Sequence, residues 1–188
     1  RAENQLKACQ NYRQFFVDAD QWEIKNLPFN SSGYDFSPAI YKEGLVYTTS
    51  RDSAKAIERE ATWIGQSFYD IYYTSKGSST SGSKAATAEE GSAEKLAGNW
   101  SKPKSVLGDG NTKYHDGPVC FTEDEGTTYF TRNNYKVQGA FNKWGKSSDN
   151  VIKLKMYEAK VNGDKWGDIK DFAYNNDEYS VGHPALSK

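Results

Sequence analysis

The sequence predicts an all-β fold, and three observations lead to this class. First, 13 Tyr, 9 Phe and 5 Trp stand among 188 residues, and aromatic and β-branched residues favour strands. Second, apolar residues occur in short alternating runs bounded by Gly, Asn, Asp or Ser, as at residues 45–49 and 151–157, and such runs are too short for helices. Third, one set of residues recurs in the same order along the chain.

Composition and charge exclude several other classes. The net charge of −1 lacks the positive excess that a nucleic-acid-binding protein needs. No stretch approaches the roughly 18 consecutive apolar residues of a membrane-spanning helix. Residues 1–5 do not have the pattern of a signal peptide. We therefore expect no nucleic-acid partner and no membrane span.

The first element is an N-terminal helical or linker segment at residues 1–21. Leu6, Cys9, Tyr12, Arg13 and Phe16 have the spacing of a short amphipathic helix, which is either a terminal helix or the end of a larger helical element. The strand pattern begins at residue 22. It is interrupted by residues 74–99, which are rich in Ser, Thr, Gly and Ala, and these predict a surface insertion loop.

Tryptophan, tyrosine and proline recur in this order three times. Tryptophan precedes proline by 16, 18 and 18 residues, and successive prolines are 80 and 66 residues apart, with the insertion loop inside the longer interval. In the first two units a glycine turn and a strand ending in arginine follow the proline. The matching positions are Trp22, Trp100 and Trp166; Tyr34, Tyr114 and Tyr179; Pro38, Pro118 and Pro184; and Arg51 and Arg132.

Each full unit holds four expected strands. One follows the proline, one follows the glycine, one lies at residues 68–75 or 151–159, and one follows the tryptophan. Four-stranded antiparallel units repeated at such intervals are typical of β-propeller blades, whereas a β-sandwich would not repeat Trp and Pro in phase. We expect a partial propeller over residues 22–188, with blades at about 38–107 and 118–172 and a third beginning at residue 184.

The repeated residues are expected to have structural roles. Proline cannot donate a ladder hydrogen bond, so each proline would open the innermost strand beside the central channel. The tryptophans would lie just ahead of the outermost strands and cover the seam between blades, although Trp22 would have little to pack against because the blade that its strand would complete is missing. The two arginines would bridge backbone carbonyls of a loop. His115 and His183 lie three and one residues before a proline, and we expect them to be packed or to face the channel.

Catalytic and metal-binding motifs are absent from the sequence. It contains no Gly-x-Ser-x-Gly and no His-Glu-x-x-His, and its two histidines occupy repeat positions. Asp109, Asn111 and Asp116 lack the alternation and the terminal Glu of a calcium loop. Cys9 and Cys120 are too far apart for a zinc or dithiol motif, and their spacing leaves a disulfide open. The sequence predicts no enzyme, no cofactor and no metal.

Five segments resemble a known family. Residues 26–31, 36–38, 47–51, 130–134 and 179–187 are similar to the TolB-like, WD-like propeller of OmpA-family envelope proteins of Bacteroidota, which include the PorE-type component of the type IX secretion system. The resemblance covers about residues 9–188. It implies a periplasmic, outer-membrane-associated scaffold that mediates protein–protein contacts in secretion or envelope anchoring. Peptidoglycan would be bound through a parent-protein domain that this chain lacks.

Two other functions are compatible with such a propeller. It would position substrate for a hydrolase or peptidase elsewhere in a parent chain, or it would bind glycans through exposed Tyr and Trp. Residues beyond Lys188 distinguish a scaffold from a hydrolase, and glycan titration tests the glycan-binding module. Exposed inner and edge strands would also invite pairing with another copy or another partner.

Overall fold

The computed structural model describes residues 2–24, 26–51, 60–61, 65–77, 100–138, 141–144 and 152–187. It is mostly β with antiparallel sheets, which confirms that part of the prediction. The expected short N-terminal helix is also present, as α1 (Ala2–Gln10). Most of the expected insertion loop, residues 78–99, lies outside the described residues.

The first sheet, called sheet 1 here, has four strands that neighbour one another in chain order. Its strand pairs are antiparallel. The two middle strands consist largely of Thr, Tyr, Val and Ile, residues that fit a pleated surface buried on both faces. The strands are β1 (Asp35–Tyr41), β2 (Gly44–Thr49), β5 (Asp70–Ser75) and β6 (Lys104–Ser105).

The second sheet, called sheet 2, repeats this arrangement and adds one strand. Its four antiparallel strands again follow chain order: β8 (Asp116–Phe121), β9 (Thr127–Asn133), β12 (Leu154–Asn162) and β13 (Lys165–Asp171). Strand β7 (Leu107–Gly108) pairs in parallel with β13. The connection between the sheets therefore runs along the far edge of sheet 2 before β8 begins.

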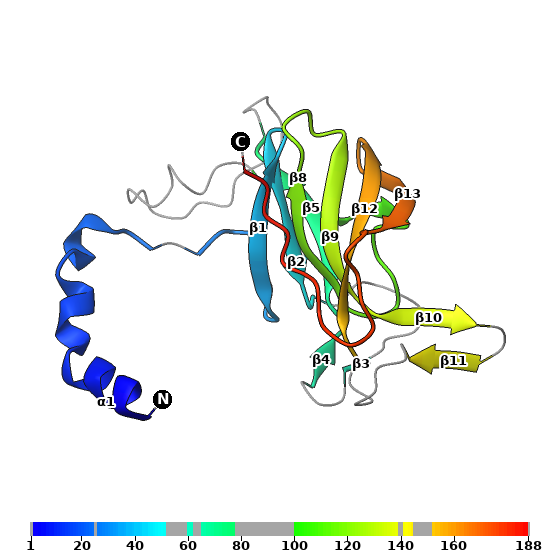
Figure 1. Cartoon of the computed structure of the whole chain (residues 1–188). Helices are drawn as coiled ribbons and strands as arrows, with labels where there is room; N and C mark the ends of the chain where they lie inside the picture. The colour runs from blue at the N-terminus through cyan, green and yellow to red at the C-terminus, as the bar shows by residue number, and fades with distance from the viewer. Residues whose placement is uncertain are drawn as a thin grey trace.

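The remaining elements are short and lie outside these two sheets. They are 3₁₀ turns η1 (Tyr12–Phe16) and η2 (Ala19–Gln21), and two hairpins formed by β3 (Glu60–Ala61) with β4 (Gln66–Ser67) and by β10 (Tyr135–Gln138) with β11 (Phe141–Trp144). The helical elements before β1 bury no residue, and Figure 1 shows them apart from the sheets.

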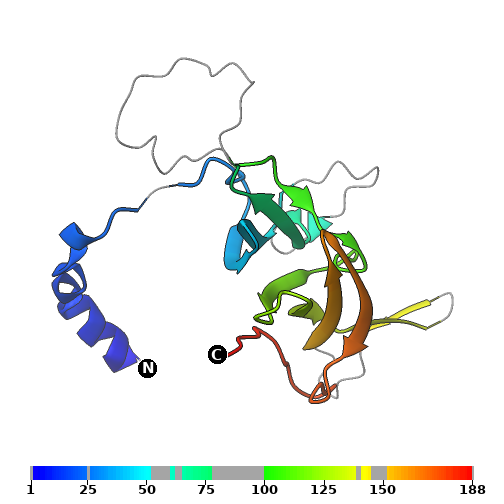
Figure 2. The same cartoon turned by 90° about the horizontal axis from the view of Figure 1, so that it is seen from above.

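One hydrophobic core lies between the two sheets. Sheet 1 contributes Val46 and Ile71, and sheet 2 contributes Phe130 and Trp166, all of them buried. Complete burial of such side chains contributes roughly 1.5–3 kcal/mol each. Figure 2 shows sheet 2 between sheet 1 and the C-terminal segment, residues 172–187. Sheet 2 is therefore covered on one face by sheet 1 and contacted on the other by the end of the chain.

Pro38 and Pro118 lie inside the first strand of their sheets rather than at its first residue, and Pro184, which was expected to open a third such strand, lies in no strand. β1 begins at Asp35, three residues before Pro38, and β8 begins at Asp116, two residues before Pro118. Each strand has a register irregularity at its proline. A bulge leaves residues out of the ladder, so the missing proline N–H removes no ladder bond there.

Candidate functional site at the joint between the sheets

An arginine in each sheet connects the first strand to the loop before it. Arg132 donates to a carboxylate oxygen of Asp116 and to the carbonyl oxygens of Asp109 at 2.8 Å and Gly110 at 3.2 Å. Arg51 donates to the carbonyl oxygen of Phe29 at 2.7 Å. It also donates to Asp35 at 3.3 Å. Arg132 therefore bridges two loop carbonyls, whereas Arg51 binds one loop carbonyl and the carboxylate.

The aspartates that pair with these arginines were not predicted as site residues. The N–H and hydroxyl groups of Ser31 donate to Asp35, and those of Thr112 donate to Asp116. In both units the hydroxyl residue precedes the aspartate by 4 residues and the arginine follows it by 16. These shared spacings are the sequence signal that would have identified both aspartates.

The two carboxylates differ in environment. Burial raises the pKa of Asp116, whose side chain is 0% exposed, and the Arg132 guanidinium and the bonds from Thr112 act against this shift. Partial burial also acts to raise the pKa of Asp35, but hydrogen bonds from Thr49, Ser31 and Arg51 outweigh it and lower the pKa. Asp116 consequently depends more on its arginine than Asp35 does.

Two aromatic rings lie beneath each guanidinium. Arg51 lies 5.5 Å from the ring centre of Tyr47 and 5.4 Å from that of Tyr72. Arg132 lies 4.9 and 5.3 Å from the rings of Phe130 and Tyr157. Both aromatic pairs are cross-strand neighbours in the middle of their sheets. Cation–π attraction therefore adds to the hydrogen bonds that hold each arginine.

Asparagine side chains clamp the third strand of each sheet. Asn111 accepts the N–H of Ile71 at 2.6 Å and donates to the carbonyl oxygen of Ile71 at 2.8 Å. Asn175 makes the same two bonds with Met156, at 2.9 and 2.7 Å. From the sequence, Asn111 is a turn residue or a candidate calcium ligand, and no pattern singles out Asn175. Asn111 thus attaches the loop before β8 to sheet 1, and Asn175 attaches the C-terminal segment to sheet 2. Each of these attachments is called a joint here.

Backbone contacts around the clamps repeat as well. The N–H of Asp116 donates to the carbonyl oxygen of Tyr69, and the N–H of Val181 donates to that of Leu154, both at 2.9 Å. The residue before each repeat proline has a positive φ: 51° at Ser37, 97° at Gly117 and 57° at His183. The C-terminal segment thus lies on sheet 2 in the way that the start of β8 lies on sheet 1.

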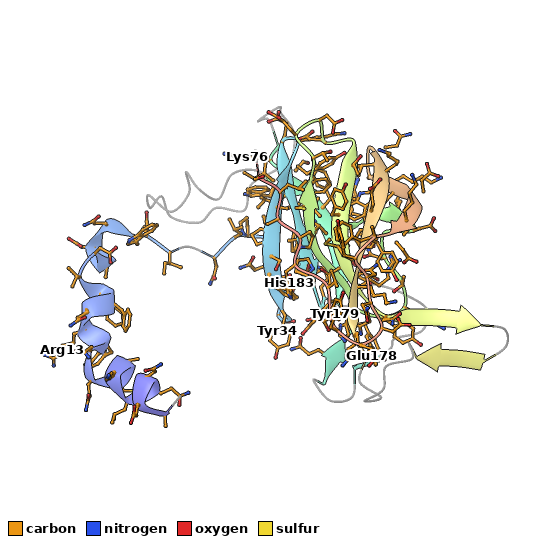
Figure 3. All side chains as sticks on the ribbon, viewed as in Figure 1. Arg13, Tyr34, Lys76, Glu178, Tyr179 and His183 are labelled. Atoms are coloured by element: carbon orange, nitrogen blue, oxygen red, sulfur yellow. The ribbon has the colours of Figure 1, made fainter. Side chains whose placement is uncertain are left out.

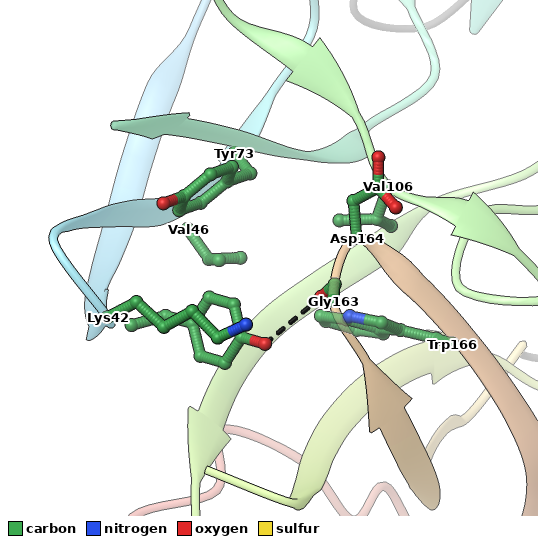
Figure 4. A pocket seen from close by; sticks show the side chains of 8 residues that line it. Lys42, Val46, Tyr73, Val106, Gly163, Asp164 and Trp166 are labelled. Atoms are coloured by element: carbon green, nitrogen blue, oxygen red, sulfur yellow. Dashed lines mark hydrogen bonds between the residues drawn. The ribbon is translucent and has the colours of Figure 1, made fainter. Parts of the chain in front are cut away.

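A pocket of about 170 Å³ opens between the sheets at their hairpin ends (Figure 4). The Tyr41 hydroxyl donates to the carbonyl oxygen of Gly163 across the pocket at 3.0 Å. The interior is apolar and aromatic, and Lys42 and Asp164 supply one charge of each sign. This seam pocket is lined by Tyr41, Lys42, Val46, Tyr73, Val106, Gly163, Asp164 and Trp166. Its chemistry suits a small apolar group.

A second, more polar pocket of about 210 Å³ lies beside the Arg51 end of β2. Ser50 accepts the N–H of Tyr34 at 2.8 Å, and its hydroxyl donates to Gln66 at 2.6 Å. The pocket is lined by Ser32, Gly33, Ser50, Arg51, Gly65, Gln66 and Ser67. Since Arg51 is engaged by Asp35 and Phe29, this pocket offers hydroxyl and amide groups rather than an unpaired cation.

The three repeat tryptophans lie in three different environments. Trp166 is 1% exposed and lies in β13 within the core between the sheets. Trp100 is partly buried and contacts Phe29 edge-on, with ring centres 5.0 Å apart. Trp22 is 72% exposed, and its Nε1 donates to the nearby Asp18 at 3.1 Å. Trp166 therefore lies between the two sheets, whereas Trp22 lies at the surface.

The repeat tyrosines and histidines also divide between interior and surface. Tyr114 is buried, whereas Tyr34 and Tyr179 are half exposed, and Figure 3 labels both on the surface. His115 is packed against Tyr69, with ring centres 4.5 Å apart, and its Nδ1 accepts the Tyr69 N–H at 3.1 Å. His183 is exposed on the C-terminal segment. The described residues do not enclose a channel in which to place either histidine.

The cysteines are both free thiols. Cys9 is exposed on α1 and Cys120 is partly buried in β8. Burial raises the pKa of Cys120, which disfavours its thiolate. The described part of the chain contains no group of three or more His, Cys, Asp or Glu placed to hold a metal ion. Within that same part, no helix is long and apolar enough to cross a membrane.

Comparison with known proteins gives no relative. No family model, no curated protein and no solved structure matches the chain.

Proposed function

We propose that the chain is a non-catalytic segment of a β-propeller that mediates protein–protein contacts. The observation that carries this proposal is the repeated joint: Asn111 clamps sheet 1 and Asn175 clamps sheet 2 through the same pair of bonds. Units that each consist of four antiparallel strands in chain order, and that mount on one another through the same contacts, are typical of propeller blades.

The seam pocket supports a contact function. Its walls are fixed aromatic and aliphatic side chains, and the Tyr41–Gly163 bond holds its two sides together. A partner side chain would place an apolar group inside and oppositely charged groups near Lys42 and Asp164. Apolar anchors that fill such pockets dominate the energetics of many interfaces, while the charges around them give specificity.

The histidines support a non-catalytic role. His115 uses Nδ1 to accept a backbone N–H, and burial lowers its pKa. His183 lies on a different segment, and its backbone N–H donates to Thr131 at 2.8 Å. A hydrolase needs a nucleophile with a base in hydrogen-bond reach and an orienting group behind that base. Neither histidine has that arrangement among the described residues.

The cellular setting is part of the same proposal. The family resemblance implies a protein of the periplasm near the outer membrane, within a type IX secretion or cell-envelope anchoring assembly. Partners would be other envelope or secretion proteins, and peptidoglycan would be reached only through another domain of a parent protein. The five segments that carry this resemblance support this setting: residues 26–31, 36–38, 47–51, 130–134 and 179–187.

Site-specific photo-crosslinking in the cells that produce the protein tests the function. A photoreactive residue at Lys42, beside the seam pocket, should yield a discrete adduct with another polypeptide. The matched control is the same residue at Lys170, an exposed position on β13. Equal adducts at both positions would argue against the pocket. Hydrolytic turnover that His115→Ala abolishes, or saturable binding of a glycan instead of a protein, would replace the proposal with one of the two alternatives.

A further inference from the structure

The face of sheet 1 that points away from sheet 2 has the features of an unfilled joint. We infer that this outer face binds a β-sheet of another polypeptide, and that Asn30 clamps one strand of that sheet. The inference rests on the proposed contact function and names a second surface and a kind of partner for it.

Asn30 corresponds to Asn111 because each directly precedes the residue that caps the aspartate of its unit. Ser31 caps Asp35 as Thr112 caps Asp116. Asn111 holds the backbone N–H and carbonyl of a strand. Asn30 is exposed, and within the described part of the chain its side-chain amide makes no hydrogen bond. An amide that is used in two equivalent positions is therefore free in the third.

Two neighbouring positions have the same contrast. Tyr34 precedes Asp35 as His115 precedes Asp116, yet Tyr34 is 50% exposed while His115 is packed in the joint. Ile40 of β1 corresponds to Phe121 of β8, because both pair with the residue that lies two positions before the aromatic residue under the arginine. Ile40 pairs with Leu45, two before Tyr47, and Phe121 pairs with Thr128, two before Phe130. Phe121 stacks on Tyr41 of sheet 1 across the joint, with ring centres 4.6 Å apart. Ile40 is 79% exposed.

Unsatisfied polar atoms lie beneath the same face. Phe29 packs on Tyr47 and Trp100, with ring centres 5.4 and 5.0 Å apart. The Tyr47 hydroxyl and the Trp100 Nε1 are buried without a hydrogen-bond partner in the described structure. A buried donor without an acceptor costs about 1–3 kcal/mol.

A second copy of this chain is a poor occupant. Its two equivalent strands are already clamped, Ile71 by Asn111 and Met156 by Asn175. Ladder pairing along the free edge of β1 is also hindered, because Pro38 lacks an N–H and the strand bulges beside it. The partner is therefore a sheet that the described residues do not contain. It offers a strand with an unpaired backbone N–H and carbonyl beside apolar side chains.

The test uses a synthetic peptide with the sequence of β12, residues 154–162, as the probe. In the free peptide the backbone that Asn175 clamps in the protein is unpaired. Titrated into the ¹⁵N-labelled full chain, it should shift the side-chain amide signal of Asn30 and the backbone signal of Ile40. Asn30→Ala should weaken binding at least about tenfold, a loss of about 1.4 kcal/mol in a clamp of two hydrogen bonds.

Matched variants make the result decisive. Asn26→Ala changes an exposed asparagine in the same loop and should bind like the wild type. Asn30→Asp keeps the acceptor, loses the donor and should also weaken binding.

Unchanged affinity in folded Asn30→Ala, or no binding at millimolar peptide, overturns the inference. If the peptide shifted only NMR signals of residues that line the seam pocket, the proposed contact function would remain, but the outer face of sheet 1 would have no part in it. Concentration-dependent self-association through Asn30 would replace the partner with a second copy.

Discussion

Arg51 and Arg132 make similar contacts but hold carboxylates of different burial. The Asp116 side chain is 0% exposed and that of Asp35 is 11% exposed. A buried charge that loses its partner retains the full cost of its dehydration, whereas a partly exposed charge regains water. The same residue type in the same network therefore has unequal energetic importance in the two sheets.

Arg132→Ala is expected to lower the free energy of unfolding by about 3–5 kcal/mol, because it leaves Asp116 buried and unpaired. Arg51→Ala is expected to cost about 1.5–3 kcal/mol, since Asp35 keeps its bonds from Ser31 and contact with solvent. Urea denaturation of both variants checks the difference. Equal losses would show that burial of the carboxylate does not decide the effect.

His115 makes stability depend on pH. Burial lowers the pKa of His115 below its ordinary value of 6.5, so the unfolded chain takes up a proton at a higher pH than the folded chain does. The contribution of neutral His115 is thus complete above about pH 6.5 and is lost as the pH falls toward the folded pKa. Unfolding free energies at several pH values between 7.5 and 5 should fall with pH, and His115→Gln should flatten the curve. A rise in stability over this range would contradict the assignment.

Residue roles were predictable where a repeat had a distinctive residue type. Arginine and proline are rare enough here to align, and the arginine bridges to loop carbonyls follow from their positions. Asp35, Asp116 and Asn175 were missed because isolated Asp and Asn in Gly-rich loops are usual turn residues. Only their spacing relative to the arginine, or their contacts with a strand far along the chain, reveals their role.

At the scale of the element, each joint depends on a loop that clamps a strand. Strand β5 leaves the N–H of Ile71 to Asn111, because its partner β6 pairs only at Tyr72 and Tyr73. The carbonyl oxygen of Ile71 accepts from Asn111 and also from the backbone N–H of Val106. Buried backbone groups must be paired, so the asparagine acts as a missing ladder partner. Because β6 is too short to pair with Ile71 in full, Asn111 supplies the hydrogen bonds that a longer β6 would make.

Asn111→Ala is expected to cost about 2–3 kcal/mol, since it leaves a buried N–H unsatisfied and a carbonyl with one bond fewer. Asn30→Ala is the matched control and should change stability by less than about 0.5 kcal/mol, because Asn30 clamps no strand in this chain. Thermal melts measure both effects, and amide exchange at Ile71 should accelerate only in Asn111→Ala. A large loss in Asn30→Ala would mean that its loop has another structural duty.

At the scale of the whole molecule, the two sheets share one core. Val46 and Ile71 come from one sheet and Phe130 and Trp166 from the other, so neither sheet can expose its inner face without exposing that of its neighbour. We expect the sheets to unfold in one cooperative transition.

Trp166→Ala should lower stability by about 3–5 kcal/mol, because it removes a large aromatic ring from the shared core. Trp22→Ala should have an effect within about 0.5 kcal/mol, since that side chain is exposed. Denaturant melts give both values, and protection of Val46 and Phe130 from hydrogen exchange should fall together in Trp166→Ala. Loss of protection in sheet 2 alone would show that the sheets unfold separately.

Most of the sheet organisation could be predicted from the sequence, because short alternating runs and turn residues define local strand structure. Strand order followed from chain order. The environments of the tryptophans do not follow from their type or repeat position: Trp22 and Trp166 occupy equivalent positions in the repeat, but burial depends on whether another sheet covers the residue. The weak packing of Trp22 was expected only because its blade is missing from the sequence. The strand starts were also placed too late, since bulges let β1 and β8 begin before their prolines.

The repeated clamp has a consequence for how such a gene can change. Each sheet receives the next through contacts supplied by the connecting segment, Asn111 in one case and Asn175 in the other. Duplicating or deleting one complete unit, from one clamp to the next, would therefore preserve both the donor and the receiver of every joint. Ancestors and descendants of this chain can therefore differ in length by whole units without evolving a new interface. A gain or loss of half a unit would instead leave an asparagine without a strand to bind.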